Sequence, residues 1–321
     1  MNQGLSAETA SCVRLLENLE RAVFGKRAQL EVVVGALLAG GHVLLEDVPG
    51  VGKTLLARAL ARSIRGEFRR LQCTPDLLPS DITGVSVYNP KDLSFEFRPG
   101  PVFANVLLAD ELNRATPRTQ SALLEAMEER QVTVEGAARP LPAPFFLVAT
   151  QNPIELAGTF PLPEAQLDRF MVRLSLGYPD GETSLRILRS QRDGDPLQSV
   201  EAILGLDQLQ ALQGAVSKVF VHESLLRYIE SCVQATRAHD HAAYGASPRG
   251  AIALLRSSQA LALIRGERFV SPDTIQRLAP NVLGHRIVVK PRSRIQGVDG
   301  ARIVEESMRR VAVPVDLSSS A

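Results

Sequence analysis

A short glycine-containing turn constrains this chain more than any other feature of its sequence. The turn reads PGVGKT over residues 49–54, between the apolar run Val43–Leu45 and the helical pattern LLARALARSI at 55–64. Two closely spaced glycines let the backbone point its N–H groups inward around phosphate oxygens. The following helix directs the positive end of its dipole at the same place. The segment therefore predicts a strand, a phosphate-binding loop and a helix.

The segment from Asp47 to Thr54 resembles the Walker A motif, with Asp47 where the first glycine belongs. Lys53 would neutralise charge on the β- and γ-phosphates of ATP, and Thr54 would be a ligand of Mg²⁺. The alternative is a Gly-Pro turn with an incidental lysine, but the flanking strand and helix favour the phosphate loop. The residues expected to contact the nucleotide here are Pro49, Gly50, Val51, Gly52, Lys53, Thr54 and Leu55.

A pair of acidic residues follows a second apolar run and has the Walker B pattern. Val106–Ala109 is typical of a buried strand, and Asp110 and Glu111 come directly after it. At the carboxyl end of a parallel strand, both side chains can face the crevice where open α/β sheets bind ligands. Asp110 would hold Mg²⁺, and Glu111 would polarise the attacking water. The alternative is a solvated acidic turn.

Strand and helix patterns alternate up to about residue 178, which predicts a parallel sheet with helices on both faces. A strand is expected at 131–135 and a loop from there to Pro144. The remainder has the pattern of an all-α domain. Helices are predicted at about 182–192, 206–219, 222–238, 248–265 and 272–280. The link at 177–181 divides the chain into a nucleotide-binding domain, 1–180, and a helical lid domain, 181–321.

Four longer segments carry a more specific resemblance. They are LLEDVPGVGKTLLARALA, LQCTPDLLPSDITG, FRPGPVFANVLLADELNRATPRTQSALLEAMEERQVTVEG and FLVATQNPIELAGTFPLPEAQLDRF. Together they resemble the MoxR family of AAA+ ATPases, in which aspartate at the first Walker A position is familiar. The similarity is continuous from about residue 20 to 180 and weaker beyond. It implies a P-loop AAA+ fold with a helical lid, hydrolysis of Mg²⁺-ATP to ADP and phosphate, and assembly into a ring, expected to be hexameric.

The resemblance also implies roles for two residues of the first domain. Asn152, just beyond the apolar strand Phe145–Ala149, resembles the sensor 1 residue, whose amide orients water against the γ-phosphate. An Asx turn before Pro153 is the alternative. Arg169 resembles the arginine finger, which acts on the nucleotide of a neighbouring subunit. A structural ion pair with Asp168 or Glu164 is the alternative for it.

Two further assignments concern the lid and the amino-terminal segment. Arg249 resembles sensor 2, a residue that contacts nucleotide, and Ser247 and Pro248 would place it in a defined first helical turn. An exposed surface arginine is the alternative. Val23 and Gly25 match the segment that packs against adenine in this superfamily, although an apolar helix end explains them equally well.

The resemblance implies a chaperone-like role in the maturation of partner proteins, often ones that carry a von Willebrand factor A domain. Insertions at 82–104 and 136–144 would face a central pore and touch substrate, unless they are ordinary surface loops. A nucleic-acid motor of a related AAA+ clade is the alternative function. The net charge of +1 disfavours it, because nucleic-acid binders usually show a basic excess. The C-terminal helices and Arg169 argue against a small-molecule kinase.

The localisation expected from the sequence is cytoplasmic. The most apolar stretch, 32–45, is shorter than the ~18 residues that a membrane-spanning helix needs. The three cysteines form no CxxC pair, and their odd number fits no disulfide framework. A reducing compartment is the simplest interpretation.

Overall fold

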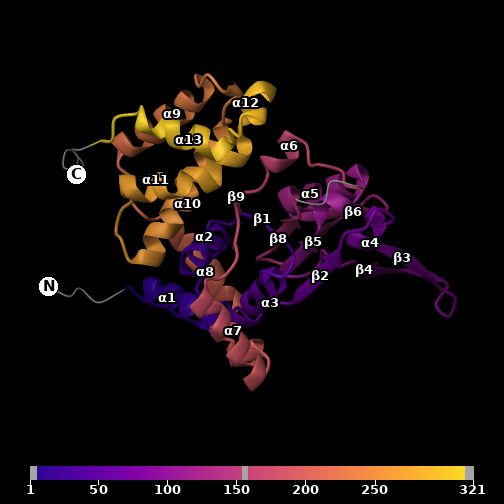
Figure 1. The fold of residues 1–321 in the computed structure, drawn as a ribbon. Coiled ribbons are helices and arrows are strands. Elements are labelled where there is room, and N and C mark those ends of the chain that lie inside the picture. Colours follow the sequence, from indigo (N-terminus) through magenta and orange to yellow (C-terminus); the bar gives the residue numbers. More distant parts are fainter. Residues whose placement is uncertain (1–5, 154–157, 315–321) are drawn as a thin grey trace.

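The computed structural model describes residues 6–153 and 158–314, and within them the central element is a five-stranded sheet (Figure 1). Its strands, in the order β2-β5-β8-β1-β9 across the sheet, are β2 (Phe68–Gln72), β5 (Val106–Asp110), β8 (Phe146–Gln151), β1 (Val43–Glu46) and β9 (Val172–Leu174). Every neighbouring pair is parallel, which confirms the predicted parallel sheet. The carboxyl ends of all the strands therefore lie along one edge, with β8 between β1 and β5.

Both faces of the sheet are covered by helices, as predicted. Along β1, Val43 and Leu45 belong to one hydrophobic cluster and Leu44 belongs to another. Successive strand residues point to opposite faces, so this alternation shows a sheet that is buried on both sides. α5 (Pro117–Glu129) packs on the face of Leu44. The opposite face is covered by α1 (Ala7–Glu20), α2 (Arg27–Leu38) and α3 (Lys53–Ser63).

The C-terminal part is a helical lid, again as predicted. Its helices are α7 (Gly181–Asp193), α8 (Leu206–Val216), α9 (Glu223–Arg237), α10 (Pro248–Arg265), α11 (Pro272–Leu283), α12 (Pro291–Ile295) and α13 (Gly300–Arg309). The last two were not predicted, and neither was the antiparallel pair β10 (Ala242–Tyr244) and β11 (Val288–Val289). α12 and the two strands are too short to show a clear periodicity in the sequence, whereas α13 buries Ile303, Val304, Ser307 and Met308 at helical spacing and could have been predicted. No helix in the described residues is both long and apolar enough to cross a membrane.

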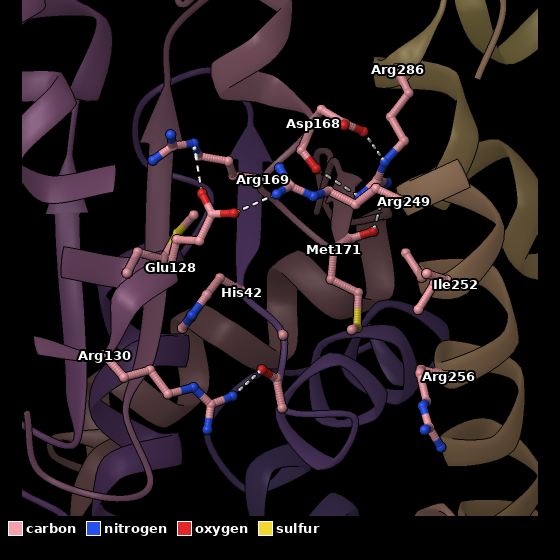
Figure 2. Close-up of a pocket in the computed structure, with 14 residues that line it drawn as sticks. His42, Glu128, Arg130, Asp168, Arg169, Met171, Arg249, Ile252, Arg256 and Arg286 are labelled. Carbon is pink, nitrogen blue, oxygen red and sulfur yellow. Dashed lines mark hydrogen bonds and ion pairs between the residues drawn. The ribbon is translucent and has the colours of Figure 1, made fainter. Parts of the chain in front are cut away.

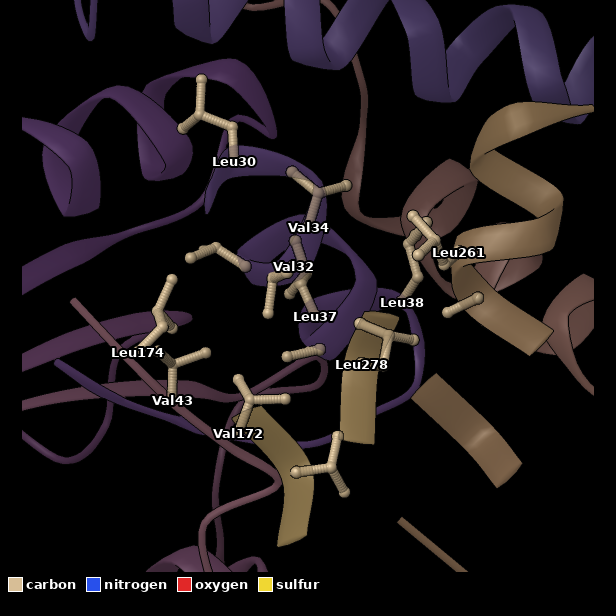
Figure 3. Close-up of a cluster of buried hydrophobic side chains, with 14 of the residues drawn as sticks. Leu30, Val32, Val34, Leu37, Leu38, Val43, Val172, Leu174, Leu261 and Leu278 are labelled. Carbon is tan, nitrogen blue, oxygen red and sulfur yellow. The ribbon is translucent and has the colours of Figure 1, made fainter. Parts of the chain in front are cut away.

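One helix joins the sheet to the lid. The buried side chains of α2, which include Leu30, Val34 and Leu37, lie between strand residues of β1 and β9 and residues of the lid helices α10 and α11, such as Leu261 and Leu278 (Figure 3). The core is therefore continuous from the sheet into the lid. The division of the chain at residue 180 stays a prediction.

Two hairpins extend from the sheet. Within the insertion expected at 82–104, β3 (Gly84–Asn89) and β4 (Ser94–Pro99) form a hairpin that projects from the body of the molecule (Figure 1). The predicted loop at 136–144 is wrong in part, because β6 (Gln131–Val134) pairs with β7 (Ala137–Pro140). Glu135 and Gly136 both have positive φ, +54° and +79°, as in the tight turns that join hairpin strands. The sequence of β7, AARP, contains no β-branched or aromatic residue, so it did not predict a strand.

Shorter helical turns complete the chain. They are α4 (Pro79–Thr83), α6 (Glu164–Leu167), η1 (Leu112–Arg114), η2 (Pro196–Ser199) and η3 (Gly284–Arg286).

Candidate functional site

The loop after β1 has the backbone shape that its glycines suggested. Gly50 and Gly52 have φ of +86° and +96°, values that L side chains rarely adopt, so both positions favour glycine. Gly52 is the N-cap residue of α3, and Lys53 and Thr54 open that helix. The Lys53 ammonium donates a hydrogen bond of 2.9 Å to the carbonyl oxygen of Asp47. The lysine is therefore folded back over the loop that it follows.

Asp47 is a buried anchor for this loop. Its side chain accepts hydrogen bonds from the Ser175 hydroxyl (2.6 Å) and from the backbone N–H groups of Leu176 (2.6 Å) and Gly177 (3.1 Å). The residue is only 5% exposed. A buried carboxylate needs such partners, and here they tie the phosphate loop to the chain that leaves β9. The sequence identified Asp47 only as a replaced glycine.

The acidic pair lies at the end of β5, as expected. The Thr150 hydroxyl donates to Asp110 Oδ1 (2.7 Å) and accepts from the backbone N–H of Glu111 (2.8 Å). Glu111 has φ +57° and ψ +49°, a left-handed conformation that is uncommon outside glycine. Such backbone strain is concentrated at functional sites. Thr150, on the neighbouring strand β8, holds both members of the pair in place.

Three polar residues that the sequence analysis missed contact the acidic pair. Arg70, on β2, donates to Asp110 Oδ2 at 2.6 Å. Gln72 donates to Glu111 Oε2 at 2.9 Å, and Arg114 forms an ion pair with the same oxygen at 3.0 Å. Arg70 and Gln72 lie toward the carboxyl end of β2, the neighbour of β5, and that placement could have identified them.

Asn152 directly follows β8 and is buried. Because β8 lies between β1 and β5, Asn152 lies at the edge of the sheet between the phosphate loop and the acidic pair. The structure thus brings Lys53, Asp110, Glu111 and Asn152 to one edge of the sheet.

A pocket of about 240 Å³ adjoins the phosphate loop, and its lining is mostly apolar. Gly25 does not line it, but its φ is +66°, and a Cβ there would lie 2.7 Å from the Thr183 hydroxyl. Glycine is therefore needed for the turn that places Val23 at the pocket. The lining includes Val23, Phe24, Gly50, Val51, Gly52, Leu55, Pro179 and Ile187.

The two remaining predicted residues, Arg169 and Arg249, lie in a different pocket, of about 230 Å³ (Figure 2). Arg169 Nε is 3.0 Å from Glu128 Oε2, and Arg249 forms an ion pair with the other oxygen of the same carboxylate. Arg169 also donates to the carbonyl oxygen of Leu124 at 3.0 Å. One glutamate of α5 therefore holds both arginines.

This arginine pocket lies at the amino-terminal ends of the strands. Its lining includes His42, which precedes β1, and Met171, which precedes β9. The structure does not bring Arg169 or Arg249 together with Lys53, which lies at the carboxyl edge. Among the described residues, Arg169 does not form the alternative ion pair with Asp168 or Glu164. Its carboxylate partner is Glu128.

Burial changes the pKa of three groups near these sites. It raises the pKa of the Cys73 thiol to about 12, with Asp110 and Glu111 adding to the effect, so the thiol is neutral. It lowers the pKa of His42 to about 3, assisted by the charge of Arg130. His42 is therefore a neutral ring that accepts a hydrogen bond from the Leu147 N–H. Burial also lowers the pKa of Arg286 to about 10, which leaves it cationic at neutral pH.

Comparison with known proteins agrees with this geometry. Residues 42–172 match the ATPase family associated with various cellular activities, and residues 234–307 match the AAA lid domain. A crystal structure of a candidate ATPase from Cytophaga hutchinsonii superposes with a TM-score of 0.90 and 38% identity, covering 96% of both chains.

Full-length relatives are also found among curated proteins. YeaC of Bacillus subtilis, whose function is uncharacterised, is 50% identical over 95% of this chain and 96% of its own length. Chaperone MoxR1 of Mycobacterium tuberculosis is 40% identical over 97% of this chain and 85% of its own. Protein MoxR of Methylorubrum extorquens is 30% identical over 94% of this chain and 93% of its own length.

Proposed function

This chain belongs to the MoxR family of AAA+ ATPases, and we therefore propose that it hydrolyses Mg²⁺-ATP to ADP and phosphate and uses the cycle to remodel partner proteins. The observation that carries the proposal is the arrangement of Lys53, Asp110 and Glu111 at one edge of the sheet, on either side of β8. Open α/β sheets bind their ligands at that edge.

The phosphate loop would bind the triphosphate through its backbone N–H groups and Lys53. Thr54 and Asp110 would hold Mg²⁺, and they fit this ion because both offer the oxygen ligands that it prefers. Bound Mg²⁺ neutralises charge on the β- and γ-phosphates. Arg70 now contacts Asp110 Oδ2, so we expect it to release that oxygen when Mg²⁺-ATP binds.

Glu111 and Asn152 would act on the attacking water. The Glu111 carboxylate can accept a proton from water, and Gln72 and Arg114 already restrict its position. Asn152 would orient the same water through its neutral amide. Val23 and the apolar lining beside the phosphate loop would enclose the adenine, with Gly25 shaping the turn.

Arg169 and Arg249 are assigned to the nucleotide of a neighbouring subunit. They lie at the edge of the sheet opposite to Lys53 of their own chain, where Glu128 balances their charge. In an assembly, phosphate oxygens of the neighbour would replace the Glu128 carboxylate. Such a head-to-tail contact joins two different surfaces and closes into a ring when the rotation permits. A hexamer is the ring size that the family resemblance implied.

The two hairpins are the proposed contact with partner proteins. β3–β4 exposes Tyr88 (48%) and Phe95 (71%), and exposed apolar groups of this kind mark interaction surfaces. It is linked to β6–β7 by a Ser86–Glu135 hydrogen bond of 2.7 Å. The link holds the two hairpins next to each other. A protein with a von Willebrand factor A domain is the partner class expected from the resemblance.

Two substitutions test the ATPase assignment. Lys53→Ala should abolish both ATP binding and phosphate release. Glu111→Gln should still bind ATP, while phosphate release falls by about 10²–10⁴-fold because the general base is lost. Nucleotide titration and a phosphate-release assay measure the two effects. Glu125→Gln, an exposed position on α5, is the control and should behave as wild type. Wild-type turnover in Glu111→Gln would remove Glu111 from the mechanism.

A further inference from the structure

We propose that Arg286, a buried arginine of the lid, is a positioning residue that fixes Arg169 and Arg249 in the arrangement that reaches a neighbouring subunit's phosphate. This inference rests on the proposed function of those two arginines. The Arg286 side chain is only 2% exposed, so it cannot itself contact a neighbour's nucleotide and would act through the two arginines. Figure 2 shows Arg286 bonded to Asp168, while Arg169 and Arg249 meet at Glu128.

Arg286 binds the turn between α6 and β9, which carries Arg169. Its Nε donates to Asp168 Oδ1 at 2.8 Å. Its two terminal nitrogens donate to the carbonyl oxygens of Asp168 (3.1 Å), Phe170 (2.7 Å) and Met171 (3.1 Å). A further bond goes to the carbonyl oxygen of Val282 in α11. The backbone on both sides of Arg169 is therefore attached to the lid.

The chemistry of these contacts is specific to arginine. A guanidinium presents five N–H donors in a rigid planar fork, whereas a lysine ammonium offers three donors at one point. The acceptors of Arg286 lie on four residues, so a single ammonium cannot serve them all. Asp168 and the backbone carbonyls compensate for the burial of this charge.

The same carboxylate also holds the helix that carries Arg249. The Ser247 hydroxyl donates to Asp168 Oδ2 at 3.1 Å, while it caps α10 by accepting from the Gly250 N–H. Gly250 also leaves room for Arg286, because a Cβ there would lie 3.0 Å from Arg286 Cδ. The first turn of α10 is thus packed against the same anchor as the turn of Arg169.

Asp168 and Arg286 therefore connect two cations that come from separate elements. The side chains of Arg169 and Arg249 are 31% and 48% exposed, and both reach Glu128. The shared anchor fixes the backbone positions from which the two side chains extend, and therefore the region that their guanidinium groups can reach. A small misplacement of a group that contacts the reacting phosphate can cost about 10²-fold in rate.

A complementation experiment separates this role from general folding. The reference mixture combines Arg169→Ala subunits, which keep an intact pocket, with Lys53→Ala subunits, which keep an intact finger. Arg286→Met is then introduced into either side, and co-assembly is checked by native mass spectrometry.

We expect an asymmetric result. Lys53→Ala/Arg286→Met subunits should restore at least ~10-fold less ATPase activity to Arg169→Ala than Lys53→Ala subunits do, because their fingers are misplaced. Arg169→Ala/Arg286→Met subunits should be rescued by Lys53→Ala subunits to the level of the reference mixture, because their own pocket is intact. Their ATP affinity should equal that of wild type.

Gly250→Ala is the second variant, in case Arg286→Met does not fold. It keeps every charge and places a Cβ 3.0 Å from Arg286 Cδ and 3.2 Å from Leu283 Cδ2, so it should displace Arg286 and show the same asymmetry with a smaller loss. The positioning role would be overturned if Lys53→Ala subunits restored the same ATPase activity with and without the second substitution. It would also be overturned if the second substitution lowered the restored activity equally in the Lys53→Ala and in the Arg169→Ala subunits. No restoration in the reference mixture would overturn the proposed function, and this inference with it.

Discussion

The two edges of the central sheet hold their charged groups in different ways. At the carboxyl edge, Asp47 is buried and its carboxylate accepts three hydrogen bonds from 175–177. At the amino edge, Arg169 and Arg249 are partly exposed and share the single carboxylate of Glu128. The first edge is tied together within one chain. The second presents two partly exposed cations, which we propose to act on the nucleotide of a neighbouring subunit.

This difference separates two kinds of mutational effect. Substitutions at the carboxyl edge should change the stability or the chemistry of the subunit that carries them. Substitutions of the exposed arginines should leave their own subunit folded and able to bind ATP, and should affect only the pocket of a neighbour. Experiments that measure stability and activity separately can therefore test the comparison.

The largest effect is expected for Arg169→Ala, which should lower ATPase activity by ~10³-fold or more, about 4 kcal/mol of transition-state stabilisation. Mixing with Lys53→Ala subunits should restore part of the activity, because some intact pockets then meet an intact finger. Arg227→Ala, on the exposed face of α9, is the control and should keep wild-type activity. If mixtures that co-assemble show no restored activity at any ratio, Arg169 would only form an ion pair within its own subunit. The ring model would then be weakened.

A pair of matched substitutions should give the next largest effect, on stability. Asp47→Asn should lower the free energy of unfolding by about 2–4 kcal/mol, because a buried carboxylate with three donors is replaced by an amide that cannot accept all of them. Glu128→Gln should lower it by about 1 kcal/mol or less, since its ion pairs are partly exposed. Urea denaturation measures both. Equal losses would contradict the contrast between the edges.

The smallest effect is expected with DNA. A net charge of +1 gives little electrostatic attraction to phosphate backbones. Single- or double-stranded DNA should therefore bind more weakly than about 10⁻⁶ M at ~0.15 M salt, and should not stimulate the ATPase. Fluorescence anisotropy with labelled oligonucleotides measures the affinity. Nanomolar binding would favour the nucleic-acid motor and would give the amino-edge arginines a second possible ligand.

The sequence alone determined the features that depend on neighbouring residues. The phosphate loop, the acidic pair after β5, the parallel sheet and the main lid helices follow from glycine spacing, apolar periodicity and capping residues. Ser247 caps the helix that it was expected to begin. These signals are local, because a turn or a helix start is set by a few consecutive residues. Where the local pattern was short, as in β7 and α12, the prediction failed.

Only the tertiary structure decided which charges meet. Arg286 pairs with Asp168, 118 positions away, and Glu128 pairs with Arg249, 121 positions away. With 36 lysine and arginine residues and 35 acidic ones, the sequence allows many pairings and favours none of these. The sheet and the lid must pack before α5, the turn after α6 and the start of α10 come together. The arginine pocket is therefore a product of the assembled core, whereas the phosphate loop is already encoded in a few consecutive residues.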